Sequence, residues 1–476
     1  MAERMSPVAS IMWEMGQDPA LRMTVGSLMV LSRAPAIDLL TERFNRAADH
    51  APMLRRHPES APGIGSQAAW VDDDQADAST HVRSMAIASP GDLRQVLDLV
   101  ALVDRSPFDP ELSPWDATLI EGLADGRVAL YLRAHHCLTD GVNGVSLVRL
   151  LLDEHAASSD EPGSVDTMPS GDDPQQSTEP EAGAKIIEAS FGSSRRRPGT
   201  VSVTVDLAGA VHPIANTLTS ARAAARRINP LDTMVRGVQR GLDVANSVSR
   251  QVVVTGGRLS PLSPSRSVST HFEAFEVSGA RTTALALGGS RNDLLVAAAG
   301  RGLGLYLERL GLPCSEVRLA SPARWRIGSE GSVVPVRAEI PVSNVHPGPL
   351  FGVVAERLAR ARHEPALHVT EALASVIGRL PTRLLMPAVR SQVGSIDFVA
   401  TTLPGIRGVR YVCGAVVEQS FPFGPRLGSL MNVTGFGVGD RLDVGVGFDP
   451  IAIAEPEVLV ACMHEAFQSF AGTNGG

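Results

Sequence analysis

Apolar and polar residues follow one another along the chain in two recurring patterns. Apolar or alternating runs predict strands at 22–32, 116–121, 127–134 and 271–277. The turn Ala124-Asp125-Gly126 would join two of these strands into a hairpin. Apolar residues at helical spacing predict helices at 36–50, 92–106, 142–155, 291–311 and 455–471. Strands and helices therefore alternate through both halves of the chain, which predicts an α/β fold.

The pattern stops between residues 156 and 199, which are rich in Ser, Asp, Glu, Pro and Gly. A segment of this composition buries too little apolar surface to fold and is typical of a flexible linker. The 476 residues of the chain also exceed what one hydrophobic core usually supports. We therefore predict an N-terminal domain at 1–155, a linker at 156–199 and a C-terminal domain at 200–476.

Charge and cysteine usage exclude several classes of protein. The formal net charge of −8 argues against a nucleic-acid partner, which would require a basic surface. The four cysteines are widely spaced without a CxxC pair, which fits neither a disulfide framework nor a zinc site and suits a reducing cytoplasm. No secretory leader pattern opens the chain, and no apolar run is long enough to span a bilayer. We expect a soluble or peripheral protein.

The main candidate for chemistry is the segment 126–144, where an apolar run ends in His135 and His136, followed by Asp140 and Gly141. If residues 128–136 form a strand, successive side chains point to opposite faces of the sheet. His136 then shares a face with apolar residues of the run, and His135 points the other way. Because the two rings cannot converge on one reaction centre, we expect one to be catalytic and the other supporting.

Several kinds of chemistry are open to this turn. Histidine titrates near neutrality, so one ring could serve as a general base. Asp140 could cap the next helix or pair with an arginine, and Gly141 would permit a backbone conformation closed to other residues. A metal site is disfavoured because it needs three converging ligands. A Cys137 nucleophile is disfavoured because a strand would point its thiol away from His136. A purely structural turn stays open as well.

The pattern His135-His136-x-x-x-Asp140-Gly141 resembles the HHxxxDG signature of the CoA-dependent acyltransferase superfamily. Within it, the chain resembles the bacterial wax ester synthase/acyl-CoA:diacylglycerol acyltransferase family. Further landmarks of that family follow in the same order: Trp70-Val71, His81-Val82-Arg83, Arg105 to Asp109, Ser113-Pro114-Trp115, Thr118 to Leu123, and Asn292-Asp293. The resemblance covers residues 6–471 except the linker.

The resemblance implies a fold and a reaction. The fold would be two domains similar to chloramphenicol acetyltransferase, each a mixed sheet covered by helices, with a substrate tunnel between them and the histidine turn at the interface. The reaction would be direct transfer of a fatty acyl group from acyl-CoA to a hydroxyl of diacylglycerol or a long-chain alcohol. The products would be triacylglycerol or wax ester and free CoA.

The resemblance also implies roles for the residues of the turn. His136 would be the general base and His135 a supporting residue. Asp140, together with Gly141, would have a structural role. Asn292 is a candidate donor to the oxyanion, with Asp293 beside it. Both of these last two residues could instead simply cap the long helix that begins there.

The implied partners are acyl-CoA, which is a substrate, and a lipid acceptor, with no resident cofactor, metal or nucleic acid. Because the acceptor dissolves in lipid, we expect a cytoplasmic protein in peripheral contact with the inner membrane or lipid inclusions. Arg222, Arg226 and Arg227 could lie on an anionic surface or form a solvated helix face.

Three segments expected in the walls of the cleft depart from the family pattern. They are Ser113-Pro114-Trp115, Ala320 to Arg324, and Thr401 to Ile406. An acyltransferase acting on another hydroxylated lipid or secondary metabolite is therefore an alternative. A catalytically weak lipid-binding or lipid-droplet protein is a third possibility, although a pure binder would not need the intact histidine turn.

Overall fold

The computed structural model of the chain describes residues 3–59, 68–73, 76–138, 148–153, 259–265, 267–327, 330–343, 346–363, 390, 393–406 and 408–472. The predicted linker at 156–199 and Arg222, Arg226 and Arg227 lie outside these residues. Asp140, Gly141 and both predicted domain boundaries also lie outside them and stay predictions.

The N-terminal half contains helices (α), short 3-10 helices (η) and strands (β). They are β1 (Glu3–Arg4), α1 (Pro7–Gly16), η1 (Pro19–Leu21), β2 (Thr24–Leu31), α2 (Ile37–His50), η2 (Pro52–Arg55), β3 (Arg56–Glu59), β4 (Ala69–Asp72), η3 (Ala78–Thr80), β5 (Val82–Gly91), α3 (Leu93–Arg105), β6 (Trp115–Leu123), β7 (Val128–His135) and η4 (His136–Leu138). The strands predicted at 22–32, 116–121 and 127–134 are confirmed as β2, β6 and β7. The helices predicted at 36–50 and 92–106 are α2 and α3.

The C-terminal half has the same mixture of elements. They are β8 (His271–Val277), α7 (Ala280–Ala286), α8 (Arg291–Arg309), β9 (Glu316–Ile327), β10 (Glu330–Pro341), α9 (Pro347–Arg362), β11 (Phe398–Ile406), β12 (Tyr411–Val412), β13 (Ala415–Phe423), β14 (Met431–Val438), β15 (Arg441–Phe448) and α12 (Pro456–Gly472). The predicted strand at 271–277 and the helices at 291–311 and 455–471 are confirmed as β8, α8 and α12. Within the described residues, none of the helices combines the length and the apolar character that crossing a membrane requires.

Six strands form the N-terminal sheet in the order β12–β13–β2–β7–β6–β5, and only the pair β5–β6 is parallel. β6 and β7 form the predicted hairpin, in which Gly126 has a φ of 78° that glycine adopts without strain. β7 is paired on both sides by β2 and β6, and all eight of its residues are buried. A long apolar run in the sequence is typical of such a central strand.

The C-terminal sheet has the order β10–β9–β11–β14–β15–β8 and is also mixed, with β11 parallel to β9 and β14. A small third sheet has the order β1–β4–β3. In the C-terminal half, α8, α9 and α12 share one apolar core with the strands. In the N-terminal half, Phe44 of α2 lies in the core cluster on one face of the sheet, and Val100 of α3 lies in the cluster on the other.

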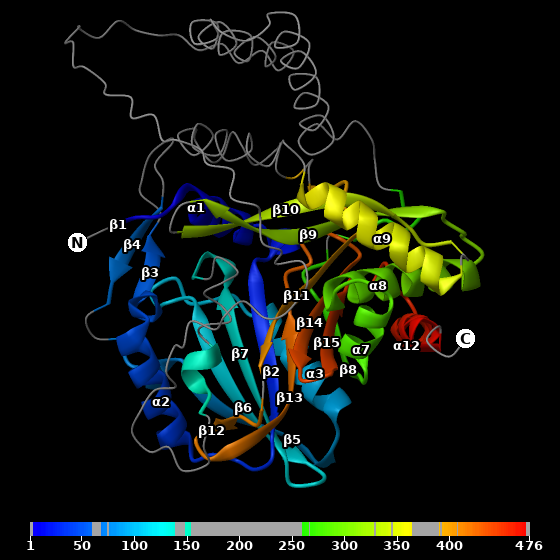
Figure 1. Cartoon of the computed structure of the whole chain (residues 1–476). Helices are drawn as coiled ribbons and strands as arrows, with labels where there is room; N and C mark the ends of the chain where they lie inside the picture. The colour runs from blue at the N-terminus through cyan, green and yellow to red at the C-terminus, as the bar shows by residue number, and fades with distance from the viewer. Residues whose placement is uncertain are drawn as a thin grey trace, which may run out of the picture. The chain divides into compact units, whose positions relative to one another are not determined.

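One pair of strands crosses from the C-terminal half into the N-terminal sheet. β12 and β13 follow β11 in sequence, yet β13 lies beside β2 in the N-terminal sheet (Figure 1). In this pair Phe421 is opposite Leu28. β13 also contacts the C-terminal sheet, because the N–H of Ser420 donates to Asp443 Oδ2 on β15 at 2.8 Å. Gly445 on β15 permits this close approach, since a Cβ there would overlap the carbonyl oxygen of Pro422. The crossing strand therefore ties the two sheets together.

Candidate active site

The side chains of β7 alternate between the two faces of the N-terminal sheet. Leu130 and Leu132 lie in the core cluster that contains α2, and Tyr131 lies in the cluster that contains α3. His135 pairs with Thr24 of β2 and is the last residue of the strand. The predicted alternation is therefore confirmed as far as His135.

The ring of His135 is buried and fixed at the end of β7. Its Nδ1 accepts a hydrogen bond from the N–H of Cys137 at 3.2 Å, which assigns the ring proton of the neutral form to Nε2. Trp13 of α1 contacts the ring edge-on, with 5.1 Å between centroids, and a Cβ at Gly16 would overlap Nε2. Burial, with a smaller contribution from His136, lowers the pKa of His135 to about 3. His135 is therefore a neutral residue that orders the turn.

His136 does not occupy the strand position that the sequence predicts. β7 ends one residue earlier, and His136 begins the 3-10 helix η4. Its N–H still donates to the carbonyl of Met23 at 2.6 Å, which continues the pairing with the chain before β2 for one more residue. The side chain is half-buried, in contrast to the buried ring of His135. The expectation that a common strand face positions His136 is thus wrong, because the chain turns at this residue.

Cys137 is buried inside the same turn. Burial raises the pKa of its thiol well above the ordinary range, so the reactive thiolate form is suppressed. This environment agrees with the prediction that Cys137 is not a nucleophile. Its N–H, which holds Nδ1 of His135, is the functional group that the turn uses.

The residues Asn292 and Asp293 at the start of α8 have different partners. Ser290 is the N-cap, and its N–H and hydroxyl donate to Asp293 Oδ2 at 2.9 and 2.7 Å, which forms a capping box. Asn292 does not cap the helix. Its Oδ1 accepts hydrogen bonds from the N–H and hydroxyl of Thr402 on β11, at 3.0 and 3.4 Å. Capping therefore accounts for Asp293 and leaves the amide of Asn292 to a different role.

An apolar cluster connects the histidine turn with β11. Cys137 and Leu138 of η4 lie in the same core cluster as Ile406, and Leu403 packs against that cluster. Leu403 directly follows Thr402, which holds Asn292. The histidine turn and the strand that anchors Asn292 thus contribute to the same apolar core cluster, which the sequence pattern alone did not indicate.

Two further landmarks of the resemblance meet close to the end of β7, where Trp115 of β6 pairs with Ala134. His81 stacks on Trp115 with 4.3 Å between ring centroids, and its Nδ1 lies 2.8 Å from the carbonyl oxygen of Trp115. The indole N–H of Trp115 donates to the carbonyl of Leu54 at 3.0 Å. Burial lowers the pKa of His81. These residues support β6 from the side of α2, where Phe44 stacks on Trp115.

Sequence reasoning missed the buried ion pair of Arg133 and Asp116. Arg133 is 2% exposed and forms hydrogen bonds of 2.7 to 2.9 Å with the carboxylate of Asp116 on β6. It also donates to the carbonyls of Asp104 and Ser106. Phe108 covers the guanidinium at 4.5 Å. A single arginine inside an apolar run was the available signal, because a buried arginine requires a partner.

Solved structures of two other proteins share this fold. The wax ester synthase/diacylglycerol acyltransferase from Marinobacter aquaeolei has 18% sequence identity and a TM-score of 0.63, covering 99% of this chain and 100% of that one. A variant of the starter condensation domain of rhizomide synthetase, in complex with C8-CoA, has 13% identity and a TM-score of 0.57, covering 100% and 95%. At these identities the likeness establishes the fold alone, and it confirms the predicted two-domain architecture of mixed sheets.

Residues 5–295 match the family model of the wax ester synthase/diacylglycerol acyltransferase catalytic domain, and residues 333–471 match that of the WS/DGAT C-terminal domain. The chain therefore belongs to the wax ester synthase/diacylglycerol acyltransferase family, and it is an acyltransferase, as the sequence predicts. A Mycobacterium tuberculosis protein named as a diacylglycerol O-acyltransferase is 28% identical over 490 residues, which cover 100% of this chain and 93% of that one. Another such protein from this organism is 33% identical over 171 residues, 36% of this chain and 37% of that one.

Proposed function

We propose that the chain transfers a fatty acyl group from acyl-CoA to the hydroxyl of diacylglycerol or a long-chain alcohol, with His136 as the general base. The contrast between the two histidines carries this assignment. His135 has a pKa lowered to about 3, and its Nδ1 already accepts the N–H of Cys137. His136 lies at the start of η4 and is half-buried, so its side chain is the more exposed of the two.

The reaction requires one proton to move twice. His136 removes the proton from the acceptor hydroxyl while the hydroxyl oxygen attacks the thioester carbonyl carbon. The tetrahedral intermediate collapses with breakage of the carbon–sulfur bond, and the protonated His136 returns the proton to the thiolate of CoA. Both substrates are bound together, so no acyl-enzyme forms and the protein supplies proximity.

The amide of Asn292 is the proposed donor to the negative oxygen of the tetrahedral intermediate. Its Oδ1 accepts the N–H of Thr402, which fixes the orientation of the amide and directs Nδ2 away from β11. Within the described residues, Nδ2 has no hydrogen-bond partner of its own, and a donor held in this way needs no reorganisation when charge develops. Pro404 and Gly405 follow on the same strand, in the segment that departs from the family pattern. We therefore expect this segment of β11 to influence acceptor preference as well.

The acceptor also determines where the enzyme works. Diacylglycerol and long-chain alcohols dissolve in lipid, so we infer peripheral contact with a membrane or lipid inclusion, with acyl-CoA arriving from the aqueous phase. Flotation of the purified chain with vesicles that contain dipalmitoylglycerol tests this contact, and a chain that stays at the bottom of the gradient contradicts it.

The test of the reaction is the product pattern of purified chains with palmitoyl-CoA and either hexadecanol or dipalmitoylglycerol. We expect wax ester or triacylglycerol by thin-layer chromatography, together with an equal amount of free thiol. His136→Ala should lower the rate by about 10² to 10⁴, the usual contribution of a general base. His363→Ala is the matched control, because His363 is exposed at the end of α9. Equal turnover in His136→Ala and the wild type would overturn the proposal.

A further inference from the structure

The ring of His135 caps the short helix that carries His136. The first N–H groups of a helix have no partner within it and need acceptors from outside. In η4 the N–H of His136 donates to the carbonyl of Met23 at 2.6 Å. The N–H of Cys137 donates to Nδ1 of His135 at 3.2 Å, where a helix usually has a serine, threonine, asparagine or aspartate as its cap. The start of η4 therefore depends on the orientation of an imidazole.

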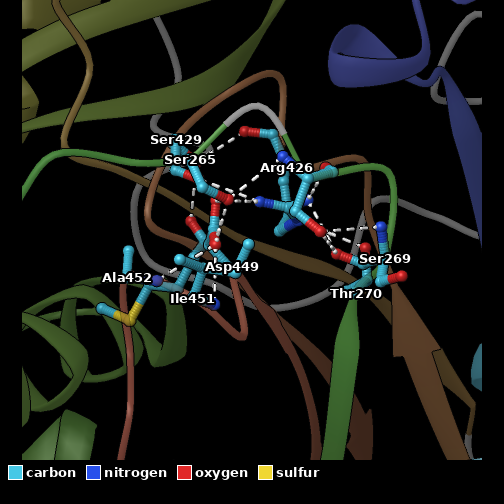
Figure 2. A network of polar contacts seen from close by, with 10 residues as sticks. Ser265, Ser269, Thr270, Arg426, Ser429, Asp449, Ile451 and Ala452 are labelled. Atoms are coloured by element: carbon cyan, nitrogen blue, oxygen red, sulfur yellow. Dashed lines mark hydrogen bonds and ion pairs between the residues drawn. The ribbon is translucent and has the colours of Figure 1, made fainter.

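The other ring nitrogen of His135 makes no hydrogen bond that would fix this orientation. Buried polar groups are normally paired, as in the network where Arg426 donates to the side chains of Asp449 and Thr270 and to the carbonyl of Ser269 (Figure 2). Nε2 of His135 is sealed from solvent and has no hydrogen-bond partner within the part of the chain that the structure describes. The ring must therefore be held by packing.

Three residues pack around the ring of His135. Trp13 of α1 contacts it edge-on with 5.1 Å between centroids, and Phe108, in the loop before β6, lies edge-on at 6.4 Å. Gly16, the last residue of α1, lies directly against Nε2. A Cβ at Gly16 would overlap Nε2 and lie 3.1 Å from both neighbouring ring carbons. A larger residue at this position would therefore displace the ring.

The chain around α1 is anchored, which limits how far the helix can move to relieve such an overlap. Met15 and Leu21 lie in a small core cluster with Val393. Beyond η1, Nη1 of Arg22 donates to the backbone carbonyl of Asp104 at 2.5 Å. This bond ties the chain between α1 and β2 to the end of α3.

A partly open pocket of about 30 Å³ adjoins this anchor. Pro19 and Ala20 of η1 line it, together with Asp104 and Arg426. Among the described residues that line the pocket, none belongs to the histidine turn. The contact of the N-terminal segment with the turn is therefore made by α1 and not through the pocket.

We propose that Gly16 and Trp13 are positioning residues of the reaction, which hold the ring of His135 as the cap of η4 and thereby place His136 for proton transfer. This inference rests on the proposed function, in which His136 is the general base. Both residues act through His135. A misplacement of about 1 Å can lower a rate about 10²-fold, so a small displacement of the ring should be visible in kcat.

The first experiment adds one methyl group beside the ring. For Gly16→Ala we expect kcat with palmitoyl-CoA and hexadecanol to fall about 10- to 100-fold, with KM for both substrates within about twofold of the wild type. Gln17→Ala is the matched control, because the side chain of Gln17 is exposed, and it should have wild-type kinetics. Rates are measured at a temperature at which thermal melts show each variant to be folded.

A second substitution distinguishes positioning from a general loss of stability. Asparagine is shorter than histidine but keeps an acceptor for the N–H of Cys137, so His135→Asn removes the overlap with a methyl group at position 16. In the His135→Asn background, Gly16→Ala should no longer lower kcat. A general effect of Gly16→Ala on folding would instead lower kcat equally in both backgrounds.

Variants of Trp13 test the same inference without His135→Asn. Phenylalanine keeps an aromatic edge against the imidazole, so Trp13→Phe should retain most of the wild-type kcat. Trp13→Ala removes the contact and should lower kcat about tenfold with KM little changed. This comparison decides the matter if His135→Asn is inactive or Gly16→Ala does not fold.

Three outcomes overturn the inference and leave the proposed function intact, provided that the wild type is active and His136→Ala is not. The first is a wild-type kcat in Gly16→Ala and in Trp13→Ala. The second is the same loss of kcat from Gly16→Ala with and without His135→Asn. The third is a raised KM with an unchanged kcat, which would assign α1 to substrate binding. If the wild type transfers to neither acceptor, the proposed function fails and this inference fails with it.

Discussion

The side-chain oxygen of Asn292 accepts the N–H of Thr402 at 3.0 Å, and this bond joins the first turn of α8 to β11. The amide can make this bond in only one orientation, because a backbone N–H requires an acceptor. The nitrogen of the amide is therefore directed away from the strand. A helix-start asparagine is usually a cap, and here the neighbouring capping box of Ser290 and Asp293 makes a second cap unnecessary.

Replacing Asn292 by aspartate separates the anchor from the proposed donor. Asn292→Asp keeps an oxygen for the N–H of Thr402 but places a second oxygen where Nδ2 was. We expect kcat to fall by about 10² to 10³, the usual effect of losing one oxyanion donor, with KM little changed. Initial rates with palmitoyl-CoA and hexadecanol measure this split. If Asn292 has only a structural role, Asn292→Asp should keep its activity and Asn292→Ala should lose thermal stability.

The elements of this fold were largely predictable because their signals are local. The predicted strand at 271–277 and the helix at 36–50 match the structure closely. The crossing of β13 into the N-terminal sheet was not predictable in this way. Its pairing with β2 joins Phe421 to Leu28, residues separated by most of the chain. Hydrophobic periodicity reports which face of a strand is buried and says nothing of its neighbour.

The candidate site, too, was predictable only where its signals are local in the sequence. The sequence predicted that one histidine would support the other; the structure buries His135, and the supporting role stays a prediction. It did not predict that the strand would end at His135, because strand ends depend on tertiary contacts. The capping box was visible as Ser290 followed three residues later by Asp293. The pocket that Asp104 lines had no signal, because residues of β8 and β13, which are remote in sequence, line it as well.

The buried His135 should make the chain sensitive to acid. Its pKa is lowered to about 3 in the folded state, against about 6.5 when unfolded, so below pH 6.5 the unfolded state binds more protons. The stability that it contributes is complete above pH 6.5 and is lost as the pH falls towards 3. Between pH 7 and pH 4 the expected loss is about 3 kcal/mol.

The variant His135→Asn isolates this effect. Asparagine keeps an acceptor for the N–H of Cys137 but does not titrate, so its acid destabilisation should be weaker than that of the wild type. Urea unfolding at pH 7, 6, 5 and 4 measures the difference between the two slopes. Parallel pH dependences would mean that His135 is not buried in its neutral form.

Asp443 should have the opposite pH dependence. Burial raises its pKa to about 6, although the N–H of Ser420 and the side chain of Arg441 partly compensate. Between pH 4 and pH 6 the folded state therefore holds a proton that the unfolded state has released, and this residue's contribution declines as the pH rises through that window. Asp443→Asn removes the titration, so its free energy of unfolding relative to the wild type should increase from pH 4 to pH 7, by at most about 3 kcal/mol.

The matched control for Asp443 is an exposed carboxylate. The side chain of Glu465 on α12 is 54% exposed and pairs with Arg309, and Glu465→Gln should shift the unfolding free energy by less than about 1 kcal/mol at any of these pH values. The same urea series serves for both variants. An Asp443→Asn curve that runs parallel to the wild type would contradict a raised pKa at the junction of β13 and β15.

Adding a methyl group at Gly445 should disturb the junction of the two sheets. A Cβ at this position of β15 would overlap the carbonyl oxygen of Pro422 and approach the ring of Phe423 to 2.9 Å. Both residues belong to β13, whose backbone is held by β2, so the strain cannot be relieved by moving one side chain. We expect Gly445→Ala to lower the free energy of unfolding by about 1–3 kcal/mol, the usual cost of overpacking. Activity should fall as well, because β13 pairs with β2, whose Thr24 pairs with His135. Gly352→Ala in α9 is the control, since a Cβ there meets no atom within 4 Å and alanine favours a helix. Thermal melts and hexadecanol turnover of the two variants measure both effects, and equal stability of Gly445→Ala and Gly352→Ala would contradict a close approach of β13 to β15.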